Sequence, residues 1–169
     1  MIQKESEVNQ AQNRILFDQI HDPKVQAILL GKIGKASEKK IQFTIDPNSS
    51  LQLLPSHIQI SQLITMIGNL LDNAFEAVQN RENGKVSFFI IDIGDDVVIE
   101  VVDNGPGIPE TMMKTILKKR ISSKDGEDRG YGLVNVSDVV NELNGMIEVN
   151  NDEIDGGAIF TIFIPKRGG

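Results

Sequence analysis

A helical segment, followed by a strand that ends in a glycine-rich loop, constrains the fold of this chain more than any other feature. Residues 58–79 are predicted to form a helix, because at about 100° per residue their apolar side chains gather on one broad face. These side chains are Leu63, Ile64, Ile67, Leu70, Leu71, Ala74, Phe75 and Val78. Residues 97–103 have the apolar pattern of a buried strand, and Asp103 stands at its end. A helix with such a face must be covered, which predicts a layer of helices on a sheet.

The rest of the chain alternates between helical and strand patterns. Further helices are expected over 5–20, 23–38, 109–117 and 131–143, and further strands over 41–46, 86–93, 146–151 and 158–164. The first two helices are separate because proline disfavours helical backbone at Asp22, the residue before it, and suits the first turn of a helix. We therefore expect an α+β two-layer sandwich, with a mixed, mostly antiparallel sheet of about five strands and three helices on one face, preceded by an N-terminal helical segment.

The composition limits the kinds of site that the chain can hold. Its 169 residues suit one domain with a short appendage, which we divide into a helical segment at 1–38 and a main domain at 39–169. The net charge of −7 argues against a fold that binds nucleic acid. Because there is no cysteine, disulfides, thiolate metal sites and cysteine nucleophiles are excluded. No signal peptide or apolar run of membrane length is present, so we expect a soluble piece, which could come from a membrane protein.

The polar face of the 58–79 helix carries side-chain oxygens in place of the usual mixture of charges. Asn69, Asn73 and Glu76 lie together there, with Asp72 beside them. Hard cations such as Mg²⁺ bind oxygen ligands and keep water and substrate phosphates in their remaining positions. This row of side-chain oxygens is consistent with a magnesium site. If the helix is considered by itself, an ordinary polar surface is the alternative interpretation.

The loop after the buried strand reads Asp103-Asn104-Gly105-Pro106-Gly107-Ile108. Gly105 and Gly107 allow the backbone to come close to a flat ring or a phosphate. The carboxylate of Asp103 can accept a hydrogen bond from an exocyclic amine such as adenine N6. For this loop alone, an ordinary Asp-Asn-Gly turn is the alternative.

A second pair of glycines, Gly130 and Gly132, opens the helix expected at 131–143. Free backbone N–H groups and the helix dipole at such an N-terminus bind phosphate. Lys124 and Arg129 stand nearby and could neutralise phosphate charge. A helix-starting turn is the alternative, because a Gly-x-Gly pair is a weak motif by itself.

In this order and spacing, the three segments resemble the ATP-binding domain of the superfamily that contains gyrase, Hsp90, histidine kinases and MutL, over roughly residues 41–165. Its N box is matched by residues 69–74, its first glycine box by 103–108 and its second glycine box by 130–133. Within the superfamily, the chain is most similar to the sensor histidine kinases, and among them to the citrate- and dicarboxylate-sensing group. That similarity lies in Asp22-Pro23 and in residues 27–32, 45–47, 67–78 and 122–124.

This resemblance implies a Bergerat-type ATP-binding fold and a role for each matched residue. Asn73 would coordinate Mg²⁺ and Asn69 would lie near the metal and the triphosphate, so these two residues carry the catalytic assignment. Asp103 would bind adenine N6. The other residues expected around ATP are Gly105, Gly107 and Ile108 at the adenine loop, Lys124, Arg129, Gly130, Gly132 and Leu133 near the phosphates, and Thr161 at the adenine pocket. A lid is expected at roughly 110–129.

The departures from the superfamily pattern favour phosphoryl transfer over hydrolysis. Related ATPases carry a catalytic Glu where this chain has Asn69, so a general base that would activate water is missing. Asp128 stands where many kinases have a further glycine, and residues 116–118 lack the Phe found in many sensor kinases. We therefore expect the lid to close differently from theirs.

The phosphate acceptor is expected outside this chain. His21 precedes the helix break at Asp22-Pro23 and His57 lies in a loop, so both are interpreted as surface histidines. Residues 1–20 are expected to be the tail of a truncated dimerisation hairpin. The resemblance implies a cytoplasmic protein-histidine kinase domain from a dimeric, membrane-bound parent that acts on a response regulator. An ATP-gated conformational ATPase and a non-catalytic nucleotide-binding adaptor are the alternatives.

Overall fold

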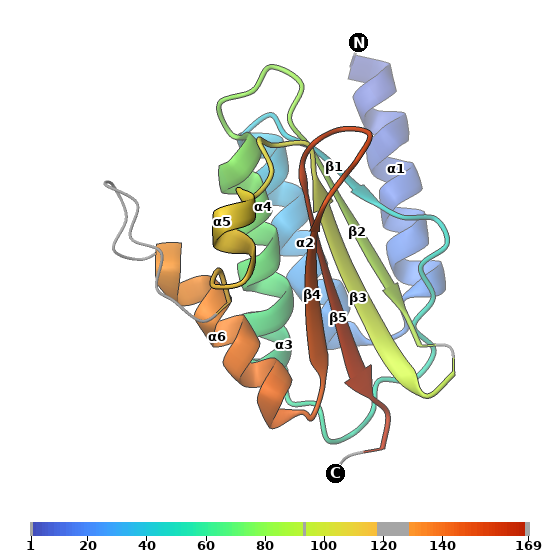
Figure 1. Cartoon of the computed structure of the whole chain (residues 1–169). Coiled ribbons are helices and arrows are strands. Elements are labelled where there is room, and N and C mark those ends of the chain that lie inside the picture. Colours follow the sequence, from blue (N-terminus) through green and yellow to red (C-terminus); the bar gives the residue numbers. More distant parts are fainter. Residues whose placement is uncertain (1, 93, 118–128, 168–169) are drawn as a thin grey trace.

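The computed structural model describes residues 2–92, 94–117 and 129–167 of the chain. Its helices are α1 (Ile2–Gln19), α2 (Pro23–Glu38), α3 (Ile60–Leu63), α4 (Asn69–Val78), α5 (Glu110–Met113) and α6 (Arg129–Glu142), with a π-helical turn (Ile64–Gly68) between α3 and α4 (Figure 1). Its strands are β1 (Gln42–Ile45), β2 (Lys85–Ile91), β3 (Asp96–Asp103), β4 (Met146–Asn151) and β5 (Ala158–Pro165).

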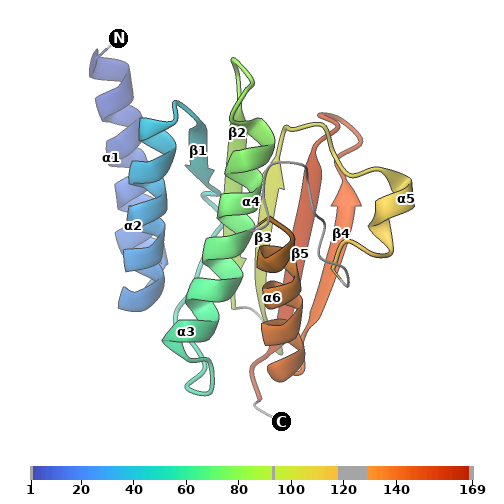
Figure 2. The ribbon, with the colours of Figure 1, turned by 90° about the vertical axis from the view of Figure 1, so that its left-hand side faces the viewer.

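The strands form one five-stranded sheet in the order β1-β2-β3-β5-β4. β1 runs parallel to β2, and every other pair of neighbouring strands is antiparallel. Figure 2 shows α2, α4 and α6 over one face of the sheet, with α1 beside α2 at the β1 end. The predicted α+β two-layer sandwich with a mixed, mostly antiparallel sheet is confirmed. Three helices cover one face as expected, but one of them is α2, which belongs to the segment expected to precede the domain, and the helix expected at 109–117 is not among them (Figure 2).

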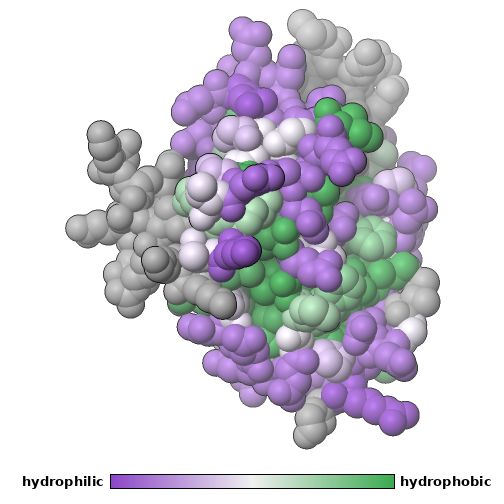
Figure 3. Space-filling view, in the orientation of Figure 1, coloured by the Kyte–Doolittle hydropathy of each residue, from purple (hydrophilic) through white to green (hydrophobic). Residues whose placement is uncertain are grey.

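The strands present apolar side chains to both faces of the sheet. In β3, Ile99 and Val101 face the helices and are buried, whereas Val98 faces away from them and pairs with Phe163 of β5. Figure 3 shows apolar side chains gathered over the strands on the face seen in Figure 1, with hydrophilic ones around them. The strand sequences therefore read as nearly continuous apolar runs instead of strict alternations.

Helices and sheet share one apolar core. Phe75 of α4 is fully buried, and its ring meets that of Phe43 from β1 edge to face, with centroids 5.6 Å apart and planes at 87°. Leu16 of α1 and Leu29 of α2 belong to the same buried cluster. The described side chains from Leu16 to Ala36 therefore tie both helices to the rest of the domain, and the assignment of residues 1–38 as the remnant of a dimerisation hairpin stays a prediction.

The predicted break between the first two helices is confirmed. Asp22 lies in extended backbone and caps α2, because its Oδ1 accepts hydrogen bonds from the backbone N–H groups of Lys24 (2.9 Å) and Val25 (3.0 Å). Pro23 occupies the first helical position, where its missing N–H costs nothing. The chain thus reverses direction between α1 and α2 without leaving backbone groups unsatisfied at this end.

The helix predicted over 58–79 is present, but it begins at Ile60 and is not uniform. It widens into the π-helical turn directly before Asn69. A π turn holds one more residue than an α turn, so the polar positions after it are rotated relative to those before it. Such insertions are frequent at functional sites, and no periodicity of the sequence indicated this one.

Two other predicted helices have different bounds in the structure. The helix expected at 109–117 is only the single turn of α5, followed by non-helical turns. The helix expected at 131–143 begins two residues earlier, at Arg129, so that Gly130 and Gly132 lie inside its first turn. Among the residues that the structure describes, no helix is long and apolar enough to cross a membrane.

The edge-to-face pair predicts the effect of a core truncation. Replacing Phe75→Ala should lower the free energy of unfolding by about 3–5 kcal/mol, because it removes a fully buried ring and leaves a cavity against Phe43. The matched control is Phe17→Ala, since Phe17 is 52% exposed and its truncation should cost less than about 1 kcal/mol. Urea unfolding of the two variants gives the comparison, and equal losses would contradict the assignment of Phe75 to the core.

Candidate functional site

The two asparagines of the N box lie one turn apart on α4, and Asn69 faces α6. The Nδ2 of Asn69 donates a hydrogen bond of 3.3 Å to the carbonyl oxygen of Gly132. The N box and the second glycine box, which are far apart in sequence, are therefore in direct contact. The amide nitrogen makes this bond, and no hydrogen bond to the Oδ1 of Asn69 is found among the described residues. Asn73 follows one turn later on the same side of the helix and is half-buried.

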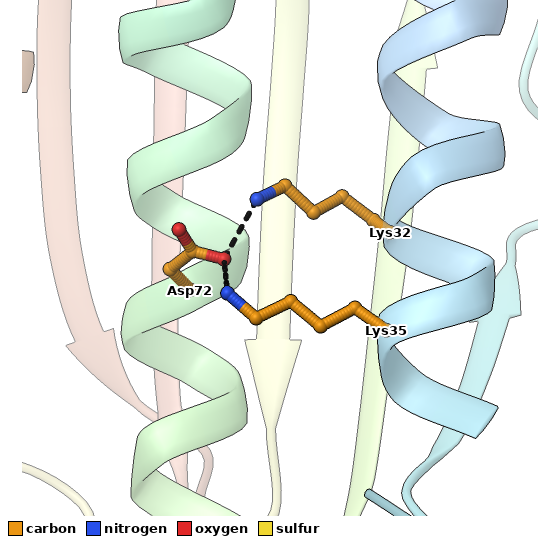
Figure 4. Close-up of polar contacts among 3 residues, drawn as sticks. All are labelled: Lys32, Lys35 and Asp72. Atoms are coloured by element: carbon orange, nitrogen blue, oxygen red, sulfur yellow. Dashed lines mark hydrogen bonds and ion pairs between the residues drawn. The ribbon is translucent and has the colours of Figure 1, made fainter. Parts of the chain in front are cut away.

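Asp72 does not belong to the row of oxygen ligands that the sequence suggested. Its Oδ1 lies 2.7 Å from the Nζ of Lys32 and 2.8 Å from the Nζ of Lys35, both on α2 (Figure 4). Burial raises the pKa of Asp72, but the hydrogen bonds and positive charges of the two lysines outweigh that effect, so its pKa is lowered overall. This carboxylate ties α4 to α2.

Asp103 ends β3 as a buried acid, with only 4% of its surface exposed. Its Oδ1 accepts hydrogen bonds from the backbone N–H of Gly105 (2.8 Å) and of Ala158 (3.3 Å). Burial raises its pKa, and this effect is larger than the opposing effects of the two hydrogen bonds and the charge of Arg81. Among the described residues no hydrogen bond reaches Oδ2, so one oxygen of a costly buried carboxylate remains for a donor such as an amine.

The glycines around Asp103 are required by the space available. A Cβ on Gly105 would lie 2.9 Å from the carbonyl oxygen of Ala77, at the end of α4. A Cβ on Gly107, which has φ +78°, would collide with the carbonyl oxygen of Gly156, and one on Gly157 would collide with the backbone of Asp103. The first glycine box is therefore enclosed between α4 and the loop that joins β4 to β5.

The two apolar residues assigned to the nucleotide site are buried in the core. Ile108 is 8% exposed and Leu133 is 5% exposed, and both are part of the core cluster. The backbone of Ile108 is held by the side chain of Asn151, a residue that the sequence analysis did not single out. Only the register of β4 against β5 brings Asn151 to this place, so no local sequence signal could have identified it.

The prediction that Thr161 lines the adenine pocket is wrong. Thr161 lies directly opposite Glu100 in the β3–β5 pair, and its hydroxyl lies 3.2 Å from the Glu100 carboxylate. Both side chains point to the face of the sheet away from the helices, because Glu100 and Asp103 are an odd number of residues apart. The β5 residue beside Asp103 is Ala158, and it contributes a backbone N–H.

The side chains of the basic residues assigned to the phosphates lie outside the part of the chain that the structure describes. Lys124 and the predicted motif at 122–124 lie outside the described residues, as does Asp128. Arg129 and Gly130 form the start of α6, but the side chain of Arg129 is outside the description. Their roles stay predictions.

The two histidines lie away from any continuous helix. His21 follows α1, is exposed, and its Nε2 lies 2.7 Å from the carbonyl oxygen of Asp18. His57 lies in the turn before α3 and is only half-buried as a whole, yet its Nε2 is buried without a partner among the described residues. His57 is therefore less of a surface residue than predicted.

A magnesium ion bound here would depend on amides, water and the phosphates of a ligand. The described residues contain no group of three or more His, Cys, Asp or Glu side chains that could hold a metal ion. Asn69 and Asn73 nonetheless present amide groups side by side, and Mg²⁺ is commonly held by few protein ligands together with phosphate oxygens. The residues present therefore fit a metal that arrives with a nucleotide better than a permanently bound one.

Comparison with known proteins identifies the class to which this fold and site belong. Residues 58–168 match the family described as histidine kinase-, DNA gyrase B- and HSP90-like ATPase, and the chain belongs to this family. Within it, the relatives match the citrate- and dicarboxylate-sensing group of sensor histidine kinases, as the sequence predicted.

The similarity to individual sensor proteins extends over nearly the whole chain. It is 55% identical to sensor protein CitS of Bacillus subtilis over 99% of this chain and 30% of that protein. It is 36% identical to sensor histidine kinase DpiB of Escherichia coli, over 98% of this chain and 31% of that one. The chain thus spans about three tenths of these curated relatives.

A solved structure with a similar fold is the nucleotide-free catalytic domain of histidine kinase ThkA, with a TM-score of 0.70 and 26% identity over 86% of this chain and 93% of that one. ThkA has also been solved in complex with the response regulator protein TrrA, and that kinase matches with a TM-score of 0.69 and 23% identity over 88% of this chain and 41% of that one.

The ion pair of Asp72 predicts a pH-dependent contribution to stability. Because the pKa of Asp72 in the folded chain is below its usual 3.8, the pair stabilises the fold at neutral pH and loses this effect as the pH falls through the folded-state pKa. Asp72→Asn should therefore lower the free energy of unfolding at pH 7 by about 0.5–1 kcal/mol, since the pair is partly exposed. The difference from wild type should vanish in acid.

Urea unfolding at a series of pH values measures this difference. The control is the same substitution in a chain that also carries Lys32→Gln and Lys35→Gln, where Asp72→Asn should have no comparable effect. A difference that persists below the folded-state pKa, or that survives loss of both lysines, would contradict the ion-pair account.

Proposed function

We propose that this chain is the ATP-binding catalytic domain of a sensor histidine kinase. It transfers the γ-phosphoryl group of Mg²⁺-ATP to a histidine on a dimerisation domain outside these residues. The observation that carries the proposal is the buried Asp103, which keeps one oxygen without a hydrogen bond among the described residues, inside a glycine loop enclosed by α4. The relatives of this chain, which are sensor kinases, support the reaction assigned to it.

Asp103 binds the adenine end of the nucleotide in this proposal. A donor such as adenine N6 replaces the hydration that the carboxylate lost on burial, so binding relieves the same penalty that raises its pKa. Gly105 and Gly107 let the loop lie close against α4 and the β4–β5 loop, where a Cβ at either position would collide with protein atoms, and their bare backbone supports contact with a planar ring. An aminopurine therefore fits this end of the site.

The phosphates lie at the other end, between α4 and α6. Asn73 would supply an oxygen to Mg²⁺, and Asn69, whose amide nitrogen is already bonded to Gly132, would offer its Oδ1 to the metal and the triphosphate. When bound, the magnesium ion would neutralise negative charge that develops on the γ-phosphoryl group during its transfer. Gly130 and Gly132, in the first turn of α6, present backbone N–H groups to phosphate, assisted by Lys124 and Arg129.

Transfer is favoured over hydrolysis because the position of a general base is filled by an amide. Asn69 cannot take a proton from water, and its nitrogen is engaged with Gly132. Water is thus not activated there, and an imidazole brought by another domain is the better nucleophile. A conformational ATPase of the same superfamily would need that base.

The partners of the domain follow from the same proposal. We infer that the parent protein is dimeric and anchored in a membrane, that this domain lies in the cytoplasm, and that a response regulator receives the phosphoryl group. Relatives are named C4-dicarboxylate sensor kinases, which supports a small carboxylate as the signal read by the parent. His21 and His57 remain unsuited as acceptors because neither lies within a helix.

Replacing Asp103→Asn separates binding from stability. The variant should bind Mg²⁺-ATP at least about tenfold more weakly, because its amide nitrogen would meet the adenine amine donor to donor. Its free energy of unfolding should stay equal or rise, because a buried charge is removed. Calorimetric titration and urea unfolding give the two values. The matched control is Asp96→Asn at the start of β3, and equal losses of affinity in both variants would contradict the adenine assignment.

A transfer assay distinguishes the kinase from its alternatives. Incubation with γ-labelled ATP and a separately made helical hairpin that carries the parent's histidine should place acid-labile label on the hairpin. Asn73→Ala should reduce this transfer by about 100-fold, since a metal ligand is lost, whereas Asn80→Ala in the turn after α4 should not. Phosphate release without label would support the ATPase, and absence of ATP binding would support the adaptor.

A further inference from the structure

The first glycine box is held from two sides by asparagine side chains. On one side, the Oδ1 of Asn104 accepts from the N–H of Lys85 (2.8 Å), and its Nδ2 donates to the carbonyl oxygen of Asn83 (2.7 Å). On the other side, the Oδ1 of Asn151 accepts from the N–H of Ile108, and its Nδ2 donates to the carbonyl oxygen of the same residue, both at 2.8 Å. Asn104 is part of the box, but Asn151 is not.

The contact of Asn151 imitates a pair of strand hydrogen bonds. A primary amide carries a donor and an acceptor side by side, as a peptide group does, and can therefore satisfy both polar groups of one backbone residue. Asn151 is the last residue of β4, the edge strand of the sheet. Its amide extends the edge of the sheet onto the loop, at a point where no strand is available to pair with Ile108.

Gly107 is the residue that lets this contact form. A Cβ on Gly107 would lie 2.9 Å from the Oδ1 of Asn151 and would also collide with the carbonyl oxygen of Gly156. Its φ of +78° turns the chain so that the N–H and carbonyl of Ile108 both face the amide. Gly107 and Asn151 therefore depend on each other, although they lie on different elements.

The loop that presents Asn151 is itself fixed. The Oδ1 of Asp152 accepts from the N–H of Ile154 at 2.9 Å, and the Asp152 backbone bonds to Gly156 (2.8 Å) and Gly157 (2.6 Å). Gly157 in turn packs on the backbone of Asp103. The Asn151 amide is thus anchored to the same segment that holds the buried carboxylate.

We propose that Asn151 is a positioning residue for the nucleotide, acting through Ile108. It holds the first glycine box in the shape in which Asp103 and the Gly107 backbone meet the adenine ring, without touching the nucleotide itself. The inference rests on the proposed function. Because the phosphates are held at the other end, by Asn69, Asn73 and α6, loss of Asn151 weakens ATP binding and leaves the transfer step intact.

The test compares three variants of this 169-residue chain. Asn151→Ala removes both hydrogen bonds. Asn151→Asp keeps the acceptor, loses the donor and places a negative charge beside the carbonyl oxygen of Ile108. Asn150→Ala is the matched control, because Asn150 is exposed and points to the opposite face of the sheet. For each chain we would measure the Kd of ATP, KM and kcat for transfer to the histidine hairpin, the melting temperature, and hydrogen exchange at the Ile108 amide.

Asn151→Ala should raise the Kd and KM of ATP about tenfold with kcat unchanged, since two hydrogen bonds of ordinary strength are lost from the loop. Asn151→Asp should weaken binding at least as much. Both should speed exchange of the Ile108 amide, and both should melt within a few degrees of wild type. Asn150→Ala should match wild type throughout.

If the wild-type chain binds ATP and the Asn151→Ala variant binds it with the same Kd, this inference is overturned and the proposed function is not. A fall in kcat that equals the rise in KM, or a general loss of stability, would also overturn it, because either would mark a structural role. Failure of the wild-type chain to bind ATP would overturn the proposed function, and this inference with it.

Discussion

Burial of the Asp103 carboxylate is the constraint on which the rest of the site depends. A charge at the end of β3 is tolerated there because the N–H groups of Gly105 and Ala158 converge on one of its oxygens. For both donors to reach it, the chain must turn tightly after β3, and the residue before β5, Gly157, must carry no side chain. The glycines are thus consequences of the buried acid, and the oxygen left over is what a ligand can use.

Helix α4 connects the two ends of the pocket as one rigid body. Its apolar face is fixed in the core by Phe75 and its neighbours, and Asn69 on the polar face contacts α6, with Asn73 one turn further along the helix. The end of the same helix touches the first glycine box through Ala77. The distance between Asn69 and the first glycine box is therefore set by helix geometry.

The N-terminal helices are joined to this body and are not a loose extension of it. Lys32 and Lys35 of α2 share the carboxylate of Asp72, one residue before the proposed metal ligand. The ion pair therefore connects α2 directly to the helix that carries Asn73. The position of α2 and that of α4 are thus linked through one carboxylate.

The sequence patterns predicted the structure correctly wherever it depends on interactions between residues close together in the chain. Helix and strand periodicity, the break at Asp22-Pro23 and the three glycine- and asparagine-bearing boxes located the fold class and the positions of Asn69, Asn73 and Asp103. The prediction for Thr161 failed because a strand offers its side chains to two faces, and the face is decided by pairing with another strand. The π-helical turn before Asn69 was likewise not predicted, because the spacing of the apolar residues does not indicate it.

The sequence by itself determined which elements form and which residue types stand at the end of each, since both depend on neighbours within a few positions. Only the tertiary structure decided which side chains are shared between elements. Asp72 forms ion pairs with α2 instead of contributing to a metal site, and the side-chain amide of Asn151, at the end of β4, hydrogen-bonds to the backbone of Ile108. The physical reason is that a side-chain carboxylate or amide bonds to whatever donor packing brings within about 3 Å, and that partner lies far away in sequence.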